Sequence, residues 1–229
     1  MVIWFASGNT HKKRELQAIL SGDGASASTG IELKIPADIG LAFNPDEIGT
    51  SFHENALIKA NALFRLLHDT GNFHPGDLVI SDDSGLCVDA LDGRPGIYSA
   101  RYRGPPGKEA PAPLDDGEKN LALLGEMSGK TRRGARFVCA MVLLQSEDTF
   151  FIAQETLEGR IVDNTEKMRG AGGFGYDPVL FIPEMNCTVA ELSEDVKNEI
   201  SHRGKAAGVI GKILSGILTT NHTNLTNKK

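Results

Sequence analysis

The chain opens with a compact apolar run over residues 2–6, which a Ser-Gly-Asn-Thr turn interrupts at once. A run rich in strand formers that stops at such a turn predicts a short buried strand. Apolar residues then recur at Leu16, Ile19 and Leu20, and this spacing along one helical face predicts a helix that begins near His11. The first segment is therefore expected to fold as a strand, a glycine turn and a helix.

A longer amphipathic helix is predicted from Ser51 to about His68. Ser51 and Glu54 have the spacing of a capping box, and Gly71 follows the last apolar position, as expected at a helix start and a helix end. A possible short strand over residues 31–35 precedes this helix. The apolar face of the helix comprises Ala56, Leu57, Ala60, Leu63, Phe64 and Leu67.

Strand patterns dominate the second half of the chain. Residues 135–144 and 149–156 predict two strands joined by an acidic hairpin turn, residues 159–162 predict a possible third, and residues 179–182 another. Because these strands follow a β/α start, we predict an α/β fold with a long mixed β-sheet and flanking helices.

Two further helices are expected. One runs from about Asp115 to Met127, and Ser201 can cap the last long one. Residues 220–229 have the composition of a disordered polar tail, so a single domain over residues 1–219 is predicted. The inward positions are Leu121, Leu123 and Leu124 in the first of these helices, and Ala206, Val209, Ile210, Ile213, Leu214 and Leu218 in the last.

The most informative polar feature is a pair of adjacent carboxylates, Asp82 and Asp83. They lie between the apolar residues 78–80 and 86–88, which predicts a turn between two strands. Adjacent carboxylates near a core repel each other and are costly unless they are paired or bind a cation such as Mg²⁺. A carboxylate beside that cation could also orient or deprotonate a water. The alternative is a solvent-exposed turn in which one carboxylate caps its own backbone.

The first predicted helix carries four basic residues, 11–14, in its first turn. The helix dipole makes cations unfavourable at this end, and a bound anion would resolve the conflict. Backbone N–H groups around Gly8 and Asn9, together with Lys12, could form a phosphate cradle. The alternative is a solvent-exposed basic turn.

The last helix also begins with cations, at His202 and Arg203. Lys197, just upstream, could neutralise a phosphate, whereas the Arg203 guanidinium could donate to a carbonyl oxygen of a base. Glu47 lies in a loop that could bring a third carboxylate to the aspartate pair. The alternative is a solvent-exposed loop residue, which an isolated acid more often is.

Four glycines occupy the six positions 170–175. Glycines cost backbone entropy on folding, and here they could let a planar ligand approach the backbone. Phe174 or Tyr176 could stack on that ligand and Asp177 could accept a hydrogen bond, which fits a nucleobase pocket. The segment lacks the spacing of a Walker A motif. The alternative is a flexible hairpin linker.

Composition narrows the possible partners. A net charge of −6 argues against a general nucleic-acid binder. The apolar residues 2–6 are too few for a signal sequence or a membrane span, so neither a nucleic acid nor a membrane is expected as a partner. Three cysteines without metal-ligand spacing fit reduced thiols and a cytoplasmic protein.

Six motifs, taken in order, resemble the inosine/xanthosine triphosphate pyrophosphatase family, the Ham1-like dITP/XTP pyrophosphatases that remove noncanonical nucleotides. The resemblance extends from residue 2 to about residue 218, and no single motif would carry it alone. The motifs are residues 7–12, 51–56, 82–86, 95–101, 172–178 and 201–204.

This resemblance implies an elongated sheet with two lobes around a central substrate cleft, a homodimer, and Mg²⁺-dependent hydrolysis of purine nucleoside triphosphates such as ITP, dITP and XTP to the monophosphate and pyrophosphate. It implies that Asp83 is the proton acceptor and a metal ligand, that Glu47 is a second metal ligand, and that Asp82 supports the metal site. The residues implied to contact substrate are Ser7, Gly8, Asn9, Thr10, His11, Lys12, Ser84, Phe174, Gly175, Tyr176, Asp177, Lys197, His202 and Arg203.

Two rival functions stay open at this point. One is a related pyrophosphatase that removes modified pyrimidine nucleotides. The other is a nucleotide-sensing module that binds without turnover, which the presence of two metal-ligand candidates, Glu47 and Asp83, disfavours.

Overall fold

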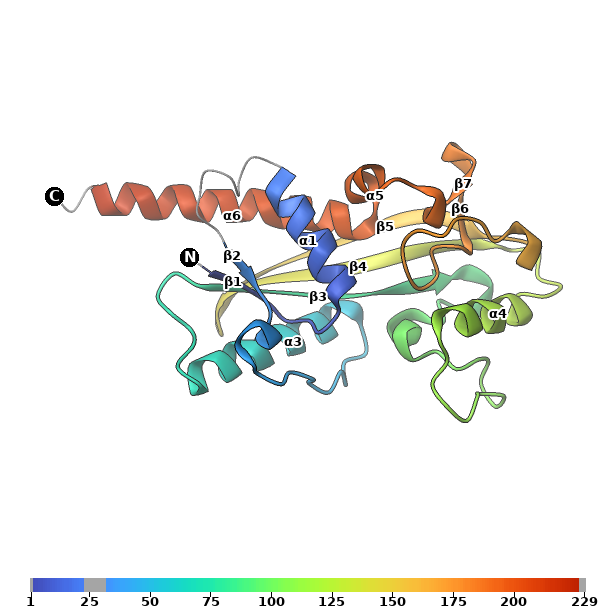
Figure 1. Cartoon of the computed structure of the whole chain (residues 1–229), viewed down its shortest axis with the longest axis horizontal. Coiled ribbons are helices and arrows are strands. Elements are labelled where there is room, and N and C mark those ends of the chain that lie inside the picture. Colours follow the sequence, from blue (N-terminus) through green and yellow to red (C-terminus); the bar gives the residue numbers. More distant parts are fainter. Residues whose placement is uncertain (1, 23–31, 227–229) are drawn as a thin grey trace. The chain divides into compact units, whose positions relative to one another are not determined.

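Seven strands form a mixed sheet in the order β2-β1-β3-β4-β5-β6-β7 (Figure 1). The computed structural model describes residues 2–22 and 32–226. β1 is parallel to β2 and β3, whereas β6 is antiparallel to β5 and β7. A mixed sheet with flanking helices confirms the predicted α/β class. The strands are β1 (Val2–Phe5), β2 (Glu32–Lys34), β3 (Leu78–Val88), β4 (Gly134–Ser146), β5 (Thr149–Ile161), β6 (Leu180–Ile182) and β7 (Cys187–Thr188).

Helices lie before, between and after these strands. The helices that begin near residues 10, 52, 116 and 202 were predicted, whereas the short helix over residues 194–200 was not. The α-helices are α1 (Thr10–Gly22), α3 (Phe52–Asp69), α4 (Asp116–Glu126), α5 (Glu194–Ile200) and α6 (His202–Thr226), and short 3-10 helices span Pro36–Ile39, Asp89–Leu91, Gly96–Arg101, Thr165–Lys167, Pro183–Met185 and Val189–Glu191.

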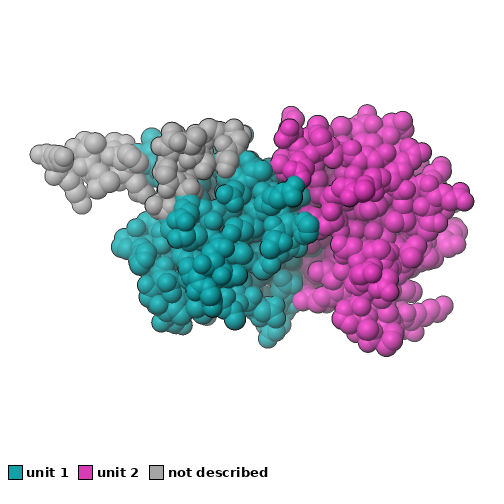
Figure 2. All heavy atoms as spheres, viewed as in Figure 1, with its two compact units in different colours: residues 1–83, 140–155, 203–229 teal, residues 84–139, 156–202 magenta. Residues whose placement is uncertain are grey.

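The chain folds into two compact units (Figure 2). Unit 1 comprises residues 1–83, 140–155 and 203–229, and unit 2 comprises residues 84–139 and 156–202. The boundaries fall inside β3, β4 and β5, so each of these strands contributes residues to both units.

Unit 1 has its own apolar core. β1 and β3 pair with Trp4 opposite Val79, and both side chains lie on the face that packs against α3. Successive side chains of a strand point to opposite faces, so the neighbouring Phe5 and Ile80 lie on the other face. Figure 1 draws α3 on one side of these strands and α1 and α6 on the other. The α3 residues in the core include all six predicted ones, Ala56, Leu57, Ala60, Leu63, Phe64 and Leu67.

The start of α3 differs in one detail from the predicted capping box. The Ser51 hydroxyl accepts from the Glu54 amide at 3.4 Å. Glu54 does not return the bond to Ser51, because its carboxylate accepts from the Thr50 amide and the Thr50 hydroxyl, both at 2.7 Å. Glu54 thus satisfies the backbone amide of Thr50, one residue before the amide expected from a capping box.

The predicted turn at Asp82 and Asp83 is wrong. Leu78–Val88 forms one continuous strand, in which Asp82 is 1% and Asp83 6% exposed. The sequence suggested a turn because adjacent Asp, Ser and Gly residues favour turns. Partners from distant segments, described below, stabilise the two carboxylates within the strand, and no local pattern reports them.

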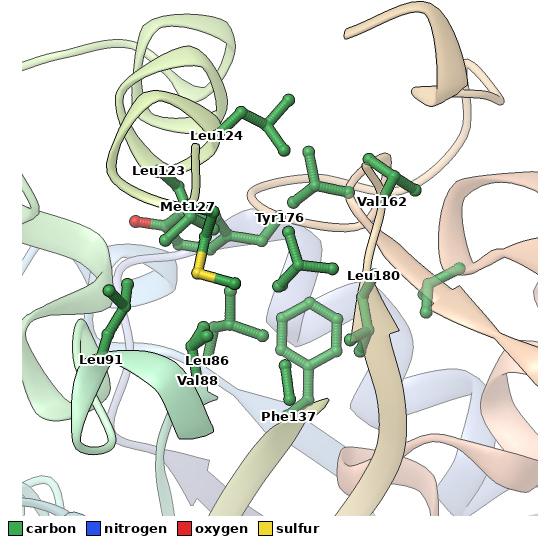
Figure 3. Close-up of a cluster of buried hydrophobic side chains, with 14 of the residues drawn as sticks. Leu86, Val88, Leu91, Leu123, Leu124, Met127, Phe137, Val162, Tyr176 and Leu180 are labelled. Atoms are coloured by element: carbon green, nitrogen blue, oxygen red, sulfur yellow. The ribbon is translucent and has the colours of Figure 1, made fainter. Parts of the chain in front are cut away.

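Unit 2 is built around a second apolar cluster (Figure 3). β4 and β5 follow each other as the predicted hairpin, and residues 159–162, predicted as a possible third strand, mostly extend β5. α4 begins after Asp115, which forms a capping box with Glu118. The labelled members of the cluster are Leu86, Val88, Leu91, Leu123, Leu124, Met127, Phe137, Val162, Tyr176 and Leu180.

α6 extends beyond its apolar stripe. It continues to Thr226, residues 227–229 lie outside the described residues, and the disordered tail over residues 220–229 stays a prediction. Once a helix is nucleated, each added residue gains a backbone hydrogen bond. Val209, predicted to point inward, is 38% exposed, and the single domain over residues 1–219 stays a prediction. The buried members of the predicted stripe are Ala206, Ile210 and Leu214.

Two findings bear on the expected environment. Across residues 2–22 and 32–226, no helix has both the length and the apolar character that crossing a bilayer requires. Cys87, Cys139 and Cys187 are free thiols, of which Cys139 is fully buried.

α4 offers a test of the buried face. Leu123 is fully buried and Leu124 nearly so, whereas Leu121, also predicted to be inward, is 55% exposed, because residues two apart do not share a helix face. We expect Leu123→Ala to lower the free energy of unfolding by about 3 kcal/mol and Leu121→Ala to change it by less than about 0.5 kcal/mol. Urea denaturation measures both. Equal losses in the two variants would contradict this placement.

Candidate active site

The central polar feature of unit 1 is the pair Asp82 and Asp83 in β3. Adjacent residues of a strand point to opposite faces of the sheet, so the two carboxylates have different neighbours. Asp82 contacts residues of α1 and α6, and Asp83 contacts residues of α3. Each carboxylate therefore has its own set of compensating groups.

The Asp82 cluster consists of Asp82, Lys12, Arg203 and Glu15. The Lys12 ammonium lies 3.0 Å from Asp82, and Nε and Nη2 of Arg203 donate to Asp82, each at 3.2 Å. Nη1 of Arg203 donates to Glu15. Burial by itself would raise the pKa of Asp82, but Lys12 and Arg203 outweigh it and hold this pKa well below its usual value. Both cationic helix starts thus find a counter-charge within the protein.

The Asp83 cluster consists of Asp83, Glu47, Lys59 and Asn55. The Lys59 ammonium donates to Glu47 at 2.7 Å and to Asp83 at 3.2 Å, and the Asn55 amide donates to Asp83 at 3.3 Å. Burial raises the pKa of Asp83 above its usual value despite the opposing charge of Lys59. Burial also disfavours the Lys59 ammonium, but the carboxylates of Asp83, Asp82 and Glu47 raise its pKa and keep it charged.

The Asp83 cluster fits a divalent cation by its chemistry. The carboxylates of Glu47 and Asp83 both accept from the Lys59 ammonium, so a single cation contacts both. Mg²⁺ is commonly held by one or two carboxylates and completes its shell with water and substrate phosphates. Within the described residues, no group of three or more His, Cys, Asp or Glu side chains forms a metal cage, so the fit is to such a shared site. Glu47 and Asp83 would hold the ion.

The loop before α1 has its backbone donors engaged by its own side chains. The Ser7 hydroxyl accepts from the Asn9 amide at 3.1 Å, and the Asn9 side chain accepts from the His11 and Lys12 amides at 2.9 and 3.2 Å. Asn9 is therefore the N-cap of α1. Of the amides predicted to cradle a phosphate, that of Asn9 is thus already bonded within the loop. The exposed residues of the loop are Gly8, Asn9, Thr10 and His11.

The polar group of unit 2 is centred on Asp177. Its carboxylate accepts from the Lys197 ammonium at 2.8 Å and from the Phe174 amide at 2.9 Å, and Lys197 lies 4.8 Å from the centre of the Phe174 ring. Gly173, at φ +74°, has no room for a side chain, because a Cβ would lie 1.9 Å from Asp177. This glycine makes room for the internal carboxylate rather than for a ligand.

Other predicted residues of unit 2 are more enclosed than expected. The Tyr176 side chain is buried and its hydroxyl donates to the Ser99 carbonyl at 3.0 Å, so of the two aromatic candidates only the half-buried Phe174 is available for stacking. His202 is buried and its ring stacks on Phe137, with centroids 4.9 Å apart. Ser84 is half-buried in β3.

Sequence reasoning missed several residues of these clusters. Lys59 and Asn55 are 8% and 0% exposed and lie four residues apart on the buried face of α3, in line with Leu63. Polar residues at helical spacing inside an apolar stripe are the signal that could have found them. Glu15 had no such signal.

The fold and the charged clusters define an α/β protein with a candidate site for an anionic, metal-associated ligand. The chain belongs to the Ham1 family, whose sequence pattern matches residues 3–211, and this confirms the predicted family. A dITP/XTP pyrophosphatase from Treponema denticola is 43% identical over 216 residues, covering 94% of this chain and all of that protein. Another, from Methylococcus capsulatus, is 44% identical over 93% of this chain and 95% of that protein.

Solved structures agree with this assignment. The Ham1 protein of Staphylococcus aureus matches with a TM-score of 0.74 and 32% identity over 94% of this chain and 99% of that one. A HAM1 protein from Coxiella burnetii matches with a TM-score of 0.75 and 30% identity over the same shares.

The Asp82 cluster predicts a large effect on stability. Asp82→Asn removes the charge that compensates the buried Arg203 and the Lys12 ammonium, so we expect the free energy of unfolding to fall by about 3 kcal/mol. Asp148→Asn, at an exposed position in the β4–β5 turn, is the matched control and should change it by less than about 0.5 kcal/mol. Equal stability of the two variants in urea denaturation would contradict the assigned role.

The same cluster predicts a pH dependence. Because the pKa of Asp82 is lowered in the folded protein, its contribution to stability is fully present above the unfolded-chain pKa of about 3.9 and is lost as the pH falls further. We expect the free energy of unfolding of the wild type to drop more steeply below about pH 4 than that of Asp82→Asn. Parallel curves between pH 6 and pH 3 would argue against a depressed pKa.

Proposed function

We propose that this protein is a Mg²⁺-dependent nucleoside triphosphate pyrophosphatase that hydrolyses ITP, dITP and XTP to the nucleoside monophosphate and pyrophosphate. Membership of the Ham1 family and the name of its relatives, dITP/XTP pyrophosphatase, support the reaction and the substrate class. The observation that carries the proposal is that the carboxylates of Glu47 and Asp83 both contact one cation, the Lys59 ammonium. Such an enzyme would keep noncanonical bases out of DNA and RNA.

We assign Asp83 as the proton acceptor. Its carboxylate is buried, and the raised pKa makes it a better base than a solvent-exposed aspartate. It would take a proton from the water that attacks the α-phosphorus, while the bond from this phosphorus to the bridging oxygen breaks and pyrophosphate leaves. Bound Mg²⁺ would neutralise phosphate charge and lower the pKa of a bound water.

The cations and the loop of unit 1 would bind the triphosphate. The Lys12 ammonium is partly accessible, with 15% of its side chain exposed, and it would stabilise negative charge that develops on the phosphates. The half-buried Ser7 and the exposed residues 8–11 would contribute hydroxyl and amide donors. Binding would then require that some capping bonds of Asn9 be exchanged for bonds to phosphate oxygens.

In unit 2, we propose that Phe174 contacts the nucleobase and that Asp177 and Lys197 fix the position of Phe174. Hypoxanthine and xanthine present an acceptor at position 6, where adenine presents a donor, and an unmet buried polar group makes such discrimination steep. The cationic start of the last helix predicted Arg203 as the matching donor. Since its guanidinium donates to Asp82 and Glu15, we assign Arg203 to holding Asp82.

The finer expectations on assembly and location are part of this proposal. We propose a homodimer, which the family resemblance supports, and a cytoplasmic location, which three free thiols support. The partner of the site is a purine nucleoside triphosphate.

A panel of triphosphates tests the proposed reaction. We expect pyrophosphate release from ITP, dITP and XTP in the presence of Mg²⁺, with kcat/KM about a hundredfold above that for ATP, dUTP or dTTP, and loss of activity when EDTA removes the metal. Preference for dUTP or dTTP would favour a pyrimidine-directed enzyme. Tight binding of ITP without release of pyrophosphate would favour a sensing module.

The assigned base gives a second test. Asp83→Asn removes the proton acceptor and one metal ligand, so kcat for ITP should fall about a thousandfold, whereas the affinity for ITP should change much less. The matched control is Asp148→Asn, which carries the same chemical change at an exposed turn. Wild-type turnover by Asp83→Asn would remove Asp83 from the mechanism.

A further inference from the structure

One residue of the glycine-rich segment of unit 2, Gly175, has both of its backbone polar groups bonded to side chains of α4. The Gly175 amide donates to the Asp116 carboxylate at 2.8 Å, and the Asn120 side-chain amide donates to the Gly175 carbonyl at 2.9 Å. Asp116 and Asn120 are four residues apart, so they lie one turn apart on the same helix face. α4 thus presents one acceptor and one donor that match the two polar groups of Gly175.

Gly175 is the residue that links Phe174 to the buried Tyr176. Its φ of +63° lies in the left-handed region that glycine adopts most readily, so the chain reverses locally at this point. On one side, the Phe174 amide is held by Asp177 at 2.9 Å. On the other, the Tyr176 hydroxyl is held by the Ser99 carbonyl at 3.0 Å. The bonds from α4 complete the fixation of the backbone that carries the Phe174 ring.

Asn120 is an unusual choice for this position if stability alone is considered. It is 2% exposed and shares its helix face with the buried Leu123 and Leu124, three and four residues further on. Its side-chain oxygen is buried and accepts no hydrogen bond, which is costly for a polar group. Only its amide nitrogen is used, and its partner is Gly175.

We propose that Asp116 and Asn120 are positioning residues for substrate binding. By fixing the backbone of Gly175 they hold the half-buried Phe174 ring in the orientation that receives the base. The conformational entropy of this segment is then lost on folding rather than on binding. The inference rests on the proposed function, since it assumes that Phe174 contacts the nucleobase. It predicts effects on the base-dependent part of affinity and not on the phosphate-dependent part.

Steady-state kinetics with ITP and Mg²⁺ test this role. Asp116→Ala and Asn120→Leu should each raise KM about tenfold, the effect of about one lost hydrogen bond, with kcat changed less than threefold, because uniform binding is lost. Asp116→Asn keeps an acceptor for the Gly175 amide and should restore KM to within about threefold of the wild type. The inhibition constant of pyrophosphate, which has no base, should be unchanged in all three variants.

The controls separate positioning from folding. Leu121→Ala alters an exposed residue of the same helix and should leave KM, kcat and the melting temperature as in the wild type. Asn120→Leu should melt close to the wild type, because the lost bond to the Gly175 carbonyl is offset by removal of a buried acceptor that has no partner. If Asn120→Leu nevertheless fails to fold, the Ala and Asn variants of the exposed Asp116 still test the positioning role.

Several results would overturn the inference. They are an unchanged KM in Asp116→Ala, an Asp116→Asn variant as impaired as Asp116→Ala, or an equal loss of pyrophosphate inhibition. If the wild type releases pyrophosphate from ITP and any of these occurs, only the positioning role fails. If the wild type releases none from any triphosphate, the proposed function fails first and the positioning role falls with it.

Discussion

Two adjacent carboxylates in the middle of a buried strand impose the main constraint on unit 1. Neither can remain ionised there without nearby cations or donors, and the alternation of a strand directs them to opposite faces. Each face must therefore bring its own compensating groups. Lys12 and Arg203 reach Asp82 from α1 and α6, and Lys59 reaches Asp83 from α3. The placement of three helices is thus tied to the charges of one strand.

The two carboxylates consequently have different chemistry. Asp82 is surrounded by cations that lower its pKa, so it stays ionised and stabilises the fold. Asp83 has a pKa raised by burial and shares a cation with Glu47. Opposite pKa shifts suit two neighbouring acids to different roles. They support the proposal that Asp83 accepts a proton beside a metal ion, while Asp82 holds the cations of α1 and α6.

Unit 2 reaches a fixed geometry by other means. The backbone of its glycine-rich segment is held by hydrogen bonds at Phe174 and Gly175, because Asp177 and α4 satisfy the polar groups there. A Cβ at Gly173 would collide with Asp177, so that glycine is required by an internal contact. A pre-ordered aromatic ring loses little entropy on binding, which suits recognition of a planar base.

The sequence by itself determined most of the strands and helices, the apolar face of α3 and the family, because hydrophobic spacing and motif order are properties of the chain. It predicted a turn at Asp82 and Asp83, since the partners of these acids are not visible in the sequence. Only the tertiary structure placed both acids within a continuous strand. Compensation of a buried charge depends on distance in space, and the groups that provide it lie up to 121 residues away along the chain.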